Sequence, residues 1–468
     1  MGWDTMRLRS GSRRVSIASI STLVLVCASK AETLVYGVDA GVAESDNVTL
    51  VSTDKVSQTI AVADADFDLI QKSRLLDLDA KGDFTYLDYL QGAYNSQLIG
   101  RFDGTAHVAL IPERLVWVLQ DDFGQAAVDP FTPVTPTNLE NINYVSTGPD
   151  LALQFGASSY VDVSARLARA QYETSPFTSN RLLGTLTWGV RLSAQSDVSL
   201  NGDTEHVMFQ NTVLNSDFDR SSGFVRYEVR GARTDLSADL GATTIDQGGI
   251  STTGGLVKVA LTRTLSAAAK LTLSAGRDLT DASTSFSTLQ SGAIGLVGTA
   301  LAAQTTANYT NNYASAGWTY ARNRTTVSLS GRWERDNYEG APLFDYTRKG
   351  AEFRVNRRLI RALSAELLGS YYKVDYANGA AALAAVNDVS PNVLIAPANL
   401  IGTPTYDDEL IGGGLTWRHG RGLEVKLRVE HSAHLTTGIY GYGENRVILT
   451  VGYRPNASQP ETEIGPGA

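Results

Sequence analysis

The side chains of this sequence best suited to metal binding or acid–base chemistry are five histidines and one short run of aspartates. His431 and His434 are three residues apart in a segment of alternating pattern, a spacing that places them on opposite faces of a strand. They therefore do not form the paired metal site that a helix would give. Asp64, Asp66 and Asp68 share one face, but the glycine and the final glutamate of a calcium-binding loop are missing. We interpret the three as an acidic ladder able to attract cations.

Other catalytic arrangements have no local signature in the sequence. His107, His206 and His419 are scattered, and no serine, histidine and acid occur together in a recognisable motif. The glycine-rich stretches "GLVGTA" and "GGG" (412–414) lack the following Lys-Ser/Thr of a phosphate-binding loop. We expect no enzymatic activity, no cofactor and no metal.

Residues 1–31 resemble a secretory signal peptide. Four arginines precede the apolar run 15–28, which is too short to span a bilayer as a stable helix, and Ser29 and Ala31 favour cleavage after Ala31. The alternatives are a retained anchor and lipidation at Cys27, the only cysteine. Cleavage would leave a chain without cysteine, which excludes disulfides and cysteine-ligated metals.

The charge balance argues against nucleic acid as a partner. The whole chain has a formal net charge of −9, and without residues 1–31 it would hold 35 basic and 48 acidic residues, a net charge of −13. After residue 31 no apolar run is long enough for a membrane-spanning helix.

Alternation with period two dominates the rest of the chain. In "GLEVKLRVEHSAHL" (422–435), Leu423, Val425, Leu427 and Val429 alternate with charged residues, and similar patterns recur in 75–86, 181–192, 224–230, 325–334 and 350–356. Short connections alternate with longer ones at 121–143, 174–180, 281–308 and 378–405. Short turns at one end and long loops at the other are typical of outer-membrane barrels.

We therefore predict an all-β fold: a single transmembrane antiparallel up-and-down β-barrel of about 20 strands, with 16 or 18 left open. It would span 32–455, between the signal peptide (1–31) and a disordered periplasmic tail (456–468). Closure removes the exposed edges of so many two-faced strands, and lipid covers their apolar side. A soluble β-helix, propeller or tandem sandwich is the alternative, but it needs a tighter repeat or two facing apolar layers. We expect no plug domain before the first strand.

Charged residues of the alternating pattern are the candidate lumen-lining set. They are Asp64, Asp66, Asp68, Asp77, Asp79, Arg226, Glu228, Arg230, Lys258, Arg332, Glu334, Glu352, Arg354, Glu424, Lys426, Arg428 and Glu430. Acids prevail in the early strands, and acids and bases mix in the later ones. Opposed acidic and basic walls would set a transverse field across a pore. Salt-bridge networks that fill the lumen are the alternative.

A resemblance to a known family comes from four segments of the N-terminal third. "GVAESDNVTL" (41–50), "SRLLDLDAKGDFTYLDYL" (73–90), "LIPERLVWVLQDDFGQ" (110–125) and "INYVSTGPDL" (142–151) resemble, in that order, the outer-membrane β-barrels encoded with exopolysaccharide and PEP-CTERM/exosortase systems, the β-barrel porin type 2 family. The resemblance implies an outer-membrane barrel linked to surface polysaccharide. The last predicted strand, "NRVILTVGYRP" (445–455), ends in alternating apolar residues and a tyrosine, like the insertion signal of such barrels, although a polar tail follows it.

From the residues we expect a channel in the outer membrane of a Gram-negative bacterium, and the resemblance implies export or surface assembly of exopolysaccharide. The alternatives are a general or small-solute porin and a non-conducting assembly or adhesion barrel. The expected partners are outer-membrane lipid, the barrel-insertion machinery and, from the resemblance, polysaccharide with its periplasmic export components. The oligomeric state is left open.

Overall fold

The computed structural model describes residues 33–129, 132–290, 307–377, 405–420, 422–436 and 441–455. The expected signal peptide, the expected C-terminal tail and most of the predicted loops 281–308 and 378–405 lie outside these ranges. Within the ranges, no helix is long and apolar enough to cross a membrane.

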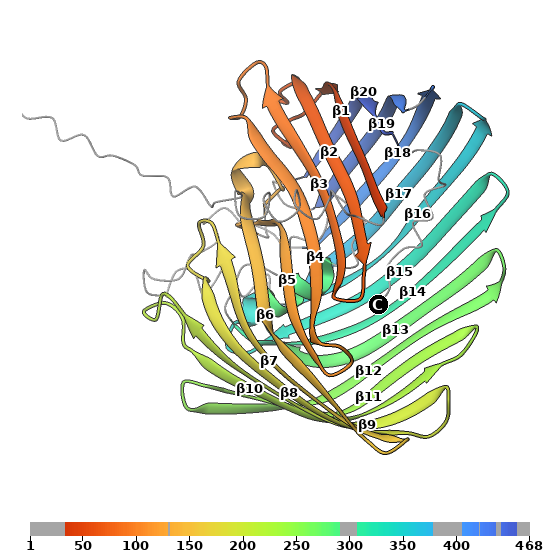
Figure 1. Cartoon of the computed structure of the whole chain (residues 1–468). Helices are drawn as coiled ribbons and strands as arrows, with labels where there is room; N and C mark the ends of the chain where they lie inside the picture. Colours follow the sequence, from red (N-terminus) through yellow and green to blue (C-terminus); the bar gives the residue numbers. More distant parts are fainter. Residues whose placement is uncertain are drawn as a thin grey trace, which may run out of the picture.

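In the described residues, twenty strands form one closed antiparallel sheet (Figure 1). Each strand pairs with the next along the chain, and the last pairs with the first. The predicted all-β up-and-down barrel of about 20 strands is confirmed, and 16 or 18 strands are wrong. The strands are β1 (Thr33–Ser45), β2 (Gln58–Lys72), β3 (Leu76–Tyr89), β4 (Gln97–Ile111), β5 (Leu115–Ala127), β6 (Leu139–Phe155), β7 (Ser159–Tyr172), β8 (Ser179–Arg191), β9 (Ser196–Phe209), β10 (Phe218–Arg230), β11 (Thr234–Gln247), β12 (Ile250–Ser266), β13 (Ala269–Thr280), β14 (Tyr309–Arg322), β15 (Thr325–Tyr338), β16 (Tyr346–Ile360), β17 (Leu363–Tyr376), β18 (Thr405–His419), β19 (Leu423–Thr436) and β20 (Tyr442–Tyr453).

The alternating residues of the sequence lie on two faces of the sheet that differ in exposure. On β19, Leu427 and Val429 are 40% and 49% exposed, whereas Glu424 and Glu430 at alternating positions of the same strand are buried. Leu182, Leu186 and Val225 on other strands are exposed in the same way. Because side chains alternate, fixing the face of one residue fixes its whole strand.

The connections follow the predicted parity. Two- to four-residue turns join β2 to β3, β8 to β9 and β14 to β15 at one end, and most longer loops lie at the other. The exception at the loop end is Gly248-Gly249 between β11 and β12. Both residues have positive φ, 58° and 82°, as a two-residue type I′ hairpin turn requires.

One predicted loop, 121–143, is too long. β5 continues to Ala127 and β6 begins at Leu139, so only a short connection with the 3-10 helix η1 (Pro136–Asn138) separates them. The paired aspartates and Gly124 resemble a loop, but the strand alternation continues through them. Ala126 and Ile142 are buried together, and this packing stabilises the added rungs.

The one α-helix of the described ranges, α2 (Ala282–Gln290), follows β13 directly in the segment that we predicted as a loop. It lies within the ring of strands, where it contacts β5 (Figure 1). A second 3-10 helix, η3 (Pro342–Phe344), precedes β16. Since α2 lies inside the barrel, the strand face that contacts it is the inner face.

Candidate functional site: the inner wall and the inward helix

The candidate lumen residues lie on the face of the sheet opposite the exposed apolar side chains. Glu424 is directly opposite Gly452, and Lys426 opposite Thr450, on the buried side of the β19–β20 pair. Arg226 and Glu228 occupy the corresponding face of β10, where alternate residues such as Val225 are exposed. On β3 the burial pattern differs: Asp77 and Asp79 are exposed, whereas Leu78 and Ala80 on the other face are buried in an apolar cluster.

Most of these charges form ion pairs that run along the wall. Within the predicted set, the pairs are Arg230–Glu228 (2.6 Å), Arg332–Glu334 (3.0 Å), Lys426–Glu424 (3.5 Å) and Arg428–Glu430 (2.5 Å). With residues that the sequence analysis did not single out, they are Arg226–Asp239 (2.7 Å), Lys258–Asp278 (2.5 Å), Arg354–Glu366 (3.3 Å), Asp79–Lys81 (3.6 Å) and Asp66–Arg454, while Glu352 accepts a hydrogen bond from Tyr372. Each pair joins residues of one strand or of strands at most two apart.

The acidic surplus lies on the inner face of β1 to β5. Directly opposed aspartates occur three times there: Asp39 with Asp64, Asp66 with Asp83, and Asp103 with Asp122. Like charges directly opposite each other destabilise a sheet, but Asp39 and Asp66 are compensated by ion pairs with Lys426 and Arg454. The opposing basic wall that we expected is not formed by the described strands, because the bases of β15 to β19 named above each pair with an acid.

The carboxylates of the acidic ladder have separate partners. Asp64 accepts a hydrogen bond from Thr85 (2.6 Å), and Asp66 accepts from Arg454 Nη1 (2.8 Å), so neighbouring carboxylates have separate partners. In the described part of the chain, no group of three histidines, cysteines or acids could hold a metal ion.

The two nearby histidines on β19 point to opposite faces. His434 lies between the rings of Tyr406 and Tyr442 and contacts Asp408 through Nδ1 (2.6 Å). His431 contacts Asn445 on the outer side (2.8 Å). The two cannot chelate one ion.

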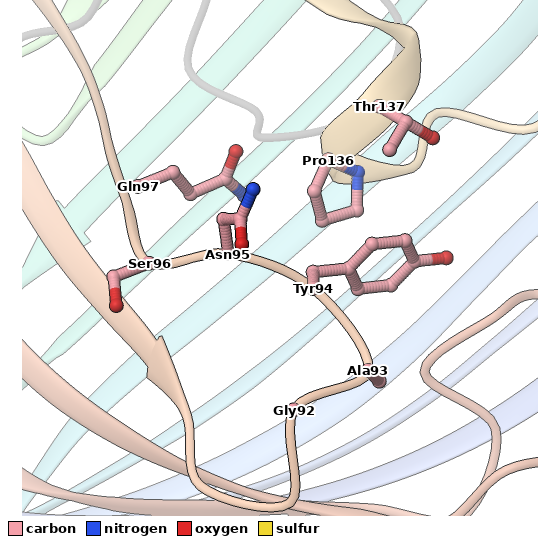
Figure 2. A pocket seen from close by; sticks show the side chains of 8 residues that line it. All are labelled: Gly92, Ala93, Tyr94, Asn95, Ser96, Gln97, Pro136 and Thr137. Carbon is pink, nitrogen blue, oxygen red and sulfur yellow. The ribbon is translucent and has the colours of Figure 1, made fainter.

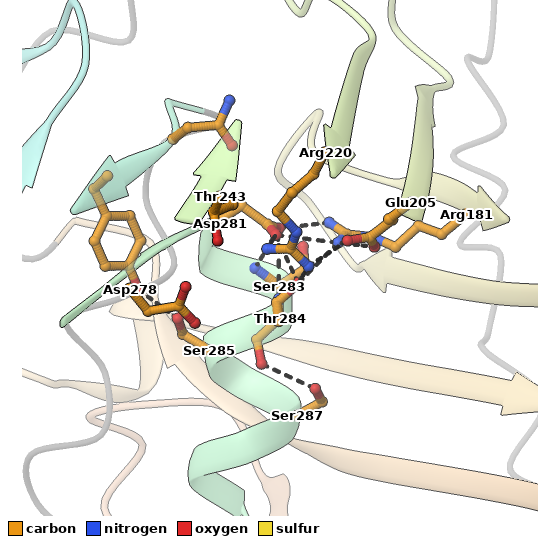
Figure 3. Close-up of polar contacts among 12 residues, drawn as sticks. Arg181, Glu205, Arg220, Thr243, Asp278, Asp281, Ser283, Thr284, Ser285 and Ser287 are labelled. Atoms are coloured by element: carbon orange, nitrogen blue, oxygen red, sulfur yellow. Dashed lines mark hydrogen bonds and ion pairs between the residues drawn. The ribbon is translucent and has the colours of Figure 1, made fainter. Parts of the chain in front are cut away.

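A buried group of four charges holds the start of α2 to the wall (Figure 3). Arg181 on β8 contacts Glu205 on β9 (2.9 Å) and Asp281, the residue before α2 (2.6 Å). Arg220 on β10 contacts the same two acids. The Arg181 side chain is 0% exposed. Two arginines and two acids give a net charge of zero, as burial of charges requires.

Asp281 also caps the helix. Its Oδ2 accepts hydrogen bonds from the backbone N–H of Ser283 (3.2 Å) and Thr284 (3.4 Å), the arrangement of an N-terminal cap. Burial raises the pKa of Asp281, but the guanidinium groups of Arg181 and Arg220 lower it by more, so the pKa lies below its ordinary value. Asp281 is therefore an anion that joins the helix to β8 and β10.

Uncharged contacts fix the other sides of α2. Phe286 is buried in an apolar cluster on β5 to β7 that includes Ile142 and Tyr144. The Tyr172 hydroxyl lies 3.0 Å from Ser283 Oγ, and the Tyr309 hydroxyl donates to Ser285 Oγ (2.5 Å). The helix is thus held by β5 to β10 and by β14.

Sequence reasoning missed this anchor. Arg181 is the first residue of the alternating segment 181–192, Arg220 lies before the segment 224–230, and Asp281 lies in a predicted loop, so nothing in the pattern brings the three together. The only local signal was an aspartate before "ASTSFSTLQ", and that segment has no apolar helical stripe.

A cleft of about 390 Å³ lies at the loop end, between the β3–β4 loop and η1 (Figure 2). Its lining is uncharged: Gly92, Ala93, Tyr94, Asn95, Ser96, Gln97, Pro136 and Thr137. Ser96 donates to Asp88 (2.6 Å) and Gln97 donates to Tyr89 (3.3 Å), so these two polar groups support the rim itself.

No protein-family model matches the chain, and no curated protein does. Solved structures similar to it include the FrpB iron transporter from Neisseria meningitidis (F5-1 variant), with 10% identity over 91% of this chain and 83% of that one at a TM-score of 0.45. The siderophore receptor PirA from Pseudomonas aeruginosa has 11% identity over 90% and 80%, at a TM-score of 0.39. OccK2 (OpdF) from the same organism has 12% identity over 91% and 98%, at a TM-score of 0.34. The resemblance to exopolysaccharide-associated barrels thus stays a prediction.

Proposed function

We propose that the protein is a passive, non-enzymatic channel of the outer membrane for small polar solutes, narrowed by α2. The observation that carries this proposal is that the ion pairs of the inner face follow the wall instead of crossing the barrel. Barrels of 16–18 strands leave an aqueous channel, and 22-stranded ones hold a plug, so 20 strands are enough to enclose a water path. Because α2 lies inside the barrel, it narrows the path, and this favours passage of small solutes over passage of a thick polymer.

The outer face supports a place in a bilayer. The strands are 12 to 17 residues long, more than the nine to eleven that a tilted strand needs to cross the hydrocarbon region. Leucine, valine and tryptophan side chains such as Leu186, Trp188 and Val451 are about half exposed on this face. Soluble monomeric proteins rarely expose so many large apolar side chains on one continuous face.

The acidic inner face of β1 to β5 supports a preference for cations. Asp83, Asp103 and Asp122 lie on one wall, whereas the charges of β15 to β19 largely balance. A local excess of one sign raises the concentration of counter-ions in a confined aqueous path. We include cation preference in the proposal.

Swelling of proteoliposomes in sugars of increasing size tests the proposal. We expect entry of small neutral sugars and exclusion of larger oligosaccharides, and a higher size limit when Phe286→Ala loosens α2. Leu186→Ala on the outer face is the matched control and should leave the limit unchanged. Folded barrels that admit no solute would contradict a channel.

Export of exopolysaccharide is the second candidate, favoured by the four sequence segments within 41–151 that resemble polysaccharide-associated barrels. Deletion of the gene distinguishes the two functions. Loss of extracellular polymer with normal solute uptake would support export, and impaired uptake with unchanged polymer would support the small-solute channel.

A further inference from the structure

The first strand, β1, pairs with the last strand, β20, through a shorter ladder than it forms with β2. β1 pairs with β20 only over Val38–Ser45 against Arg446–Tyr453, whereas it pairs with β2 over its full length, Thr33–Ser45. The two strands lie side by side although they come from opposite ends of the chain (Figure 1). We call this β1–β20 junction the seam. With fewer ladder hydrogen bonds, it is the part of the wall that needs other support.

One ion pair crosses the seam from β19 to β1. Lys426 Nζ lies 2.7 Å from Asp39 Oδ2, and β20 runs between the two strands. The intervening residue opposite Asp39 is Gly452. A Cβ at Gly452 would lie 1.9 Å from Asp39 Oδ1, so the carboxylate occupies the space that any side chain there would fill.

A second ion pair crosses in the same manner from the end of β20 to β2. Arg454 Nη1 donates to Asp66 Oδ2 (2.8 Å), and β1 lies between them. The intervening residue opposite Asp66 is Gly37, where a Cβ would lie 2.6 Å from Arg454 Nη2. Both pairs therefore skip one strand by passing over a glycine.

Glu424 joins the two crossings into one network. It lies 2.6 Å from Arg418 Nε, 3.5 Å from Lys426 Nζ and 3.8 Å from Arg454 Nε. Its side chain is 1% exposed. The network Arg418, Glu424, Lys426, Asp39, Arg454 and Asp66 runs from β18 to β2 and balances three bases with three acids.

The loop end of the seam has its own ties. Asn445 donates through its backbone N–H and its Nδ2 to the two carboxylate oxygens of Asp46, both at 2.7 Å. Asn47 Nδ2 donates to the Gly443 carbonyl (3.1 Å). The ionic network thus supports the half of the seam nearer the short turns, where the β1–β20 ladder ends at Val38 and Tyr453.

We propose that this six-residue network is a closure lock that keeps the barrel shut between β1 and β20. The seam has few backbone hydrogen bonds. Ion pairs between the strands on either side of it therefore add the most stability at this part of the wall. When the lock is broken, the barrel opens first at the seam, and an intact lock confines passage to the barrel axis. The lock goes beyond the proposed channel function and does not depend on which solute passes.

Lys426→Met tests the lock against a matched control, Arg226→Met. The Lys426–Asp39 pair has side-chain exposures of 33% and 5%, and the Arg226–Asp239 pair has 38% and 5%. The second pair joins adjacent strands far from the seam. In the full barrel, the temperature at which the folded gel band converts to the unfolded band should fall by several degrees more for Lys426→Met than for Arg226→Met.

Two further variants keep the test decisive if Lys426→Met does not fold. Gly452→Ala retains every charge but displaces Asp39, and it should also lower the conversion temperature.

The second variant is a disulfide across the seam. Ala40→Cys and Val451→Cys lie opposite each other on β1 and β20, and their disulfide should raise the conversion temperature more than one between Val225→Cys and Leu240→Cys on β10 and β11. No native cysteine lies within 33–455 to interfere. Equal shifts for the seam and control variants in both comparisons would overturn the lock.

Discussion

Replacing Arg181 by methionine should release α2 from the barrel wall. Methionine keeps much of the side-chain volume but removes the guanidinium that contacts Glu205 and Asp281. The two acids then share only Arg220, so the group of four charges becomes a buried group of three with a net charge of −1. The apolar contacts of Phe286 remain.

The size of the effect follows from burial. Breaking a buried ion pair by removing one partner typically costs about 3–5 kcal/mol. Because Arg220 still contacts both acids, we expect about 3 kcal/mol, the lower end of that range. At 1.36 kcal/mol per tenfold change, the population with α2 undocked should rise by about two orders of magnitude.

Native-state hydrogen exchange of the peptide covering α2 measures that population. The amide of Ser285, which donates to the Asp281 carbonyl (3.0 Å), is one of the groups that undocking would expose. Its exchange should accelerate by about two orders of magnitude in Arg181→Met, while strand amides stay protected. Arg226→Met is the control with a more exposed arginine.

Unchanged exchange of α2 in Arg181→Met would refute the anchoring role of the ion group. A double variant, Arg181→Met with Asp281→Asn, removes one uncompensated charge and should be less disturbed than the sum of the single changes. A double variant that showed simple additivity would mean that the two residues do not act together.

Three other predictions concern the outer face, the acidic wall and pH. Leu427→Arg should weaken folding into bilayers by about 2–4 kcal/mol if residue 427 lies near the midplane, with Leu427→Ile close to wild type, as denaturant titration in vesicles would show. Asp83→Asn combined with Asp103→Asn should move the reversal potential in a salt gradient towards zero, and an unchanged potential would exclude this wall from selectivity. Because the pKa of Asp281 is lowered in the folded protein, its contribution is complete above its ordinary pKa and is lost as pH falls through the lowered one. The docked state of α2 should therefore resist mild acid, and exchange that already accelerates near pH 5 would contradict this.

The strands and their order could be predicted because their signals are local. Alternation in segments such as 422–435 and the turn residues between them are read within one hairpin, and the alternating segments 224–230, 325–334 and 350–356 lie within β10, β15 and β16. The predicted loop 121–143 began too early, since "DDFGQAA" resembles a loop until its partner residues on β6 are known.

The anchor of α2 could not be predicted because it depends on contacts between distant residues. Arg181 and Asp281 are 100 residues apart in sequence, and nothing near either of them indicates the other. The same holds for Gly37 and Gly452, which resemble ordinary strand glycines until Arg454 and Asp39 are placed over them. Closure of the sheet creates these sites.

Single-channel recording in planar bilayers tests the proposed channel most directly. We expect the purified barrel to conduct in discrete steps, and Phe286→Ala, which loosens α2 on its apolar side, to give larger steps than wild type, with Leu186→Ala unchanged. Barrels that insert and show heat-modifiable gel mobility, but carry no current in either form, would contradict a channel narrowed by α2.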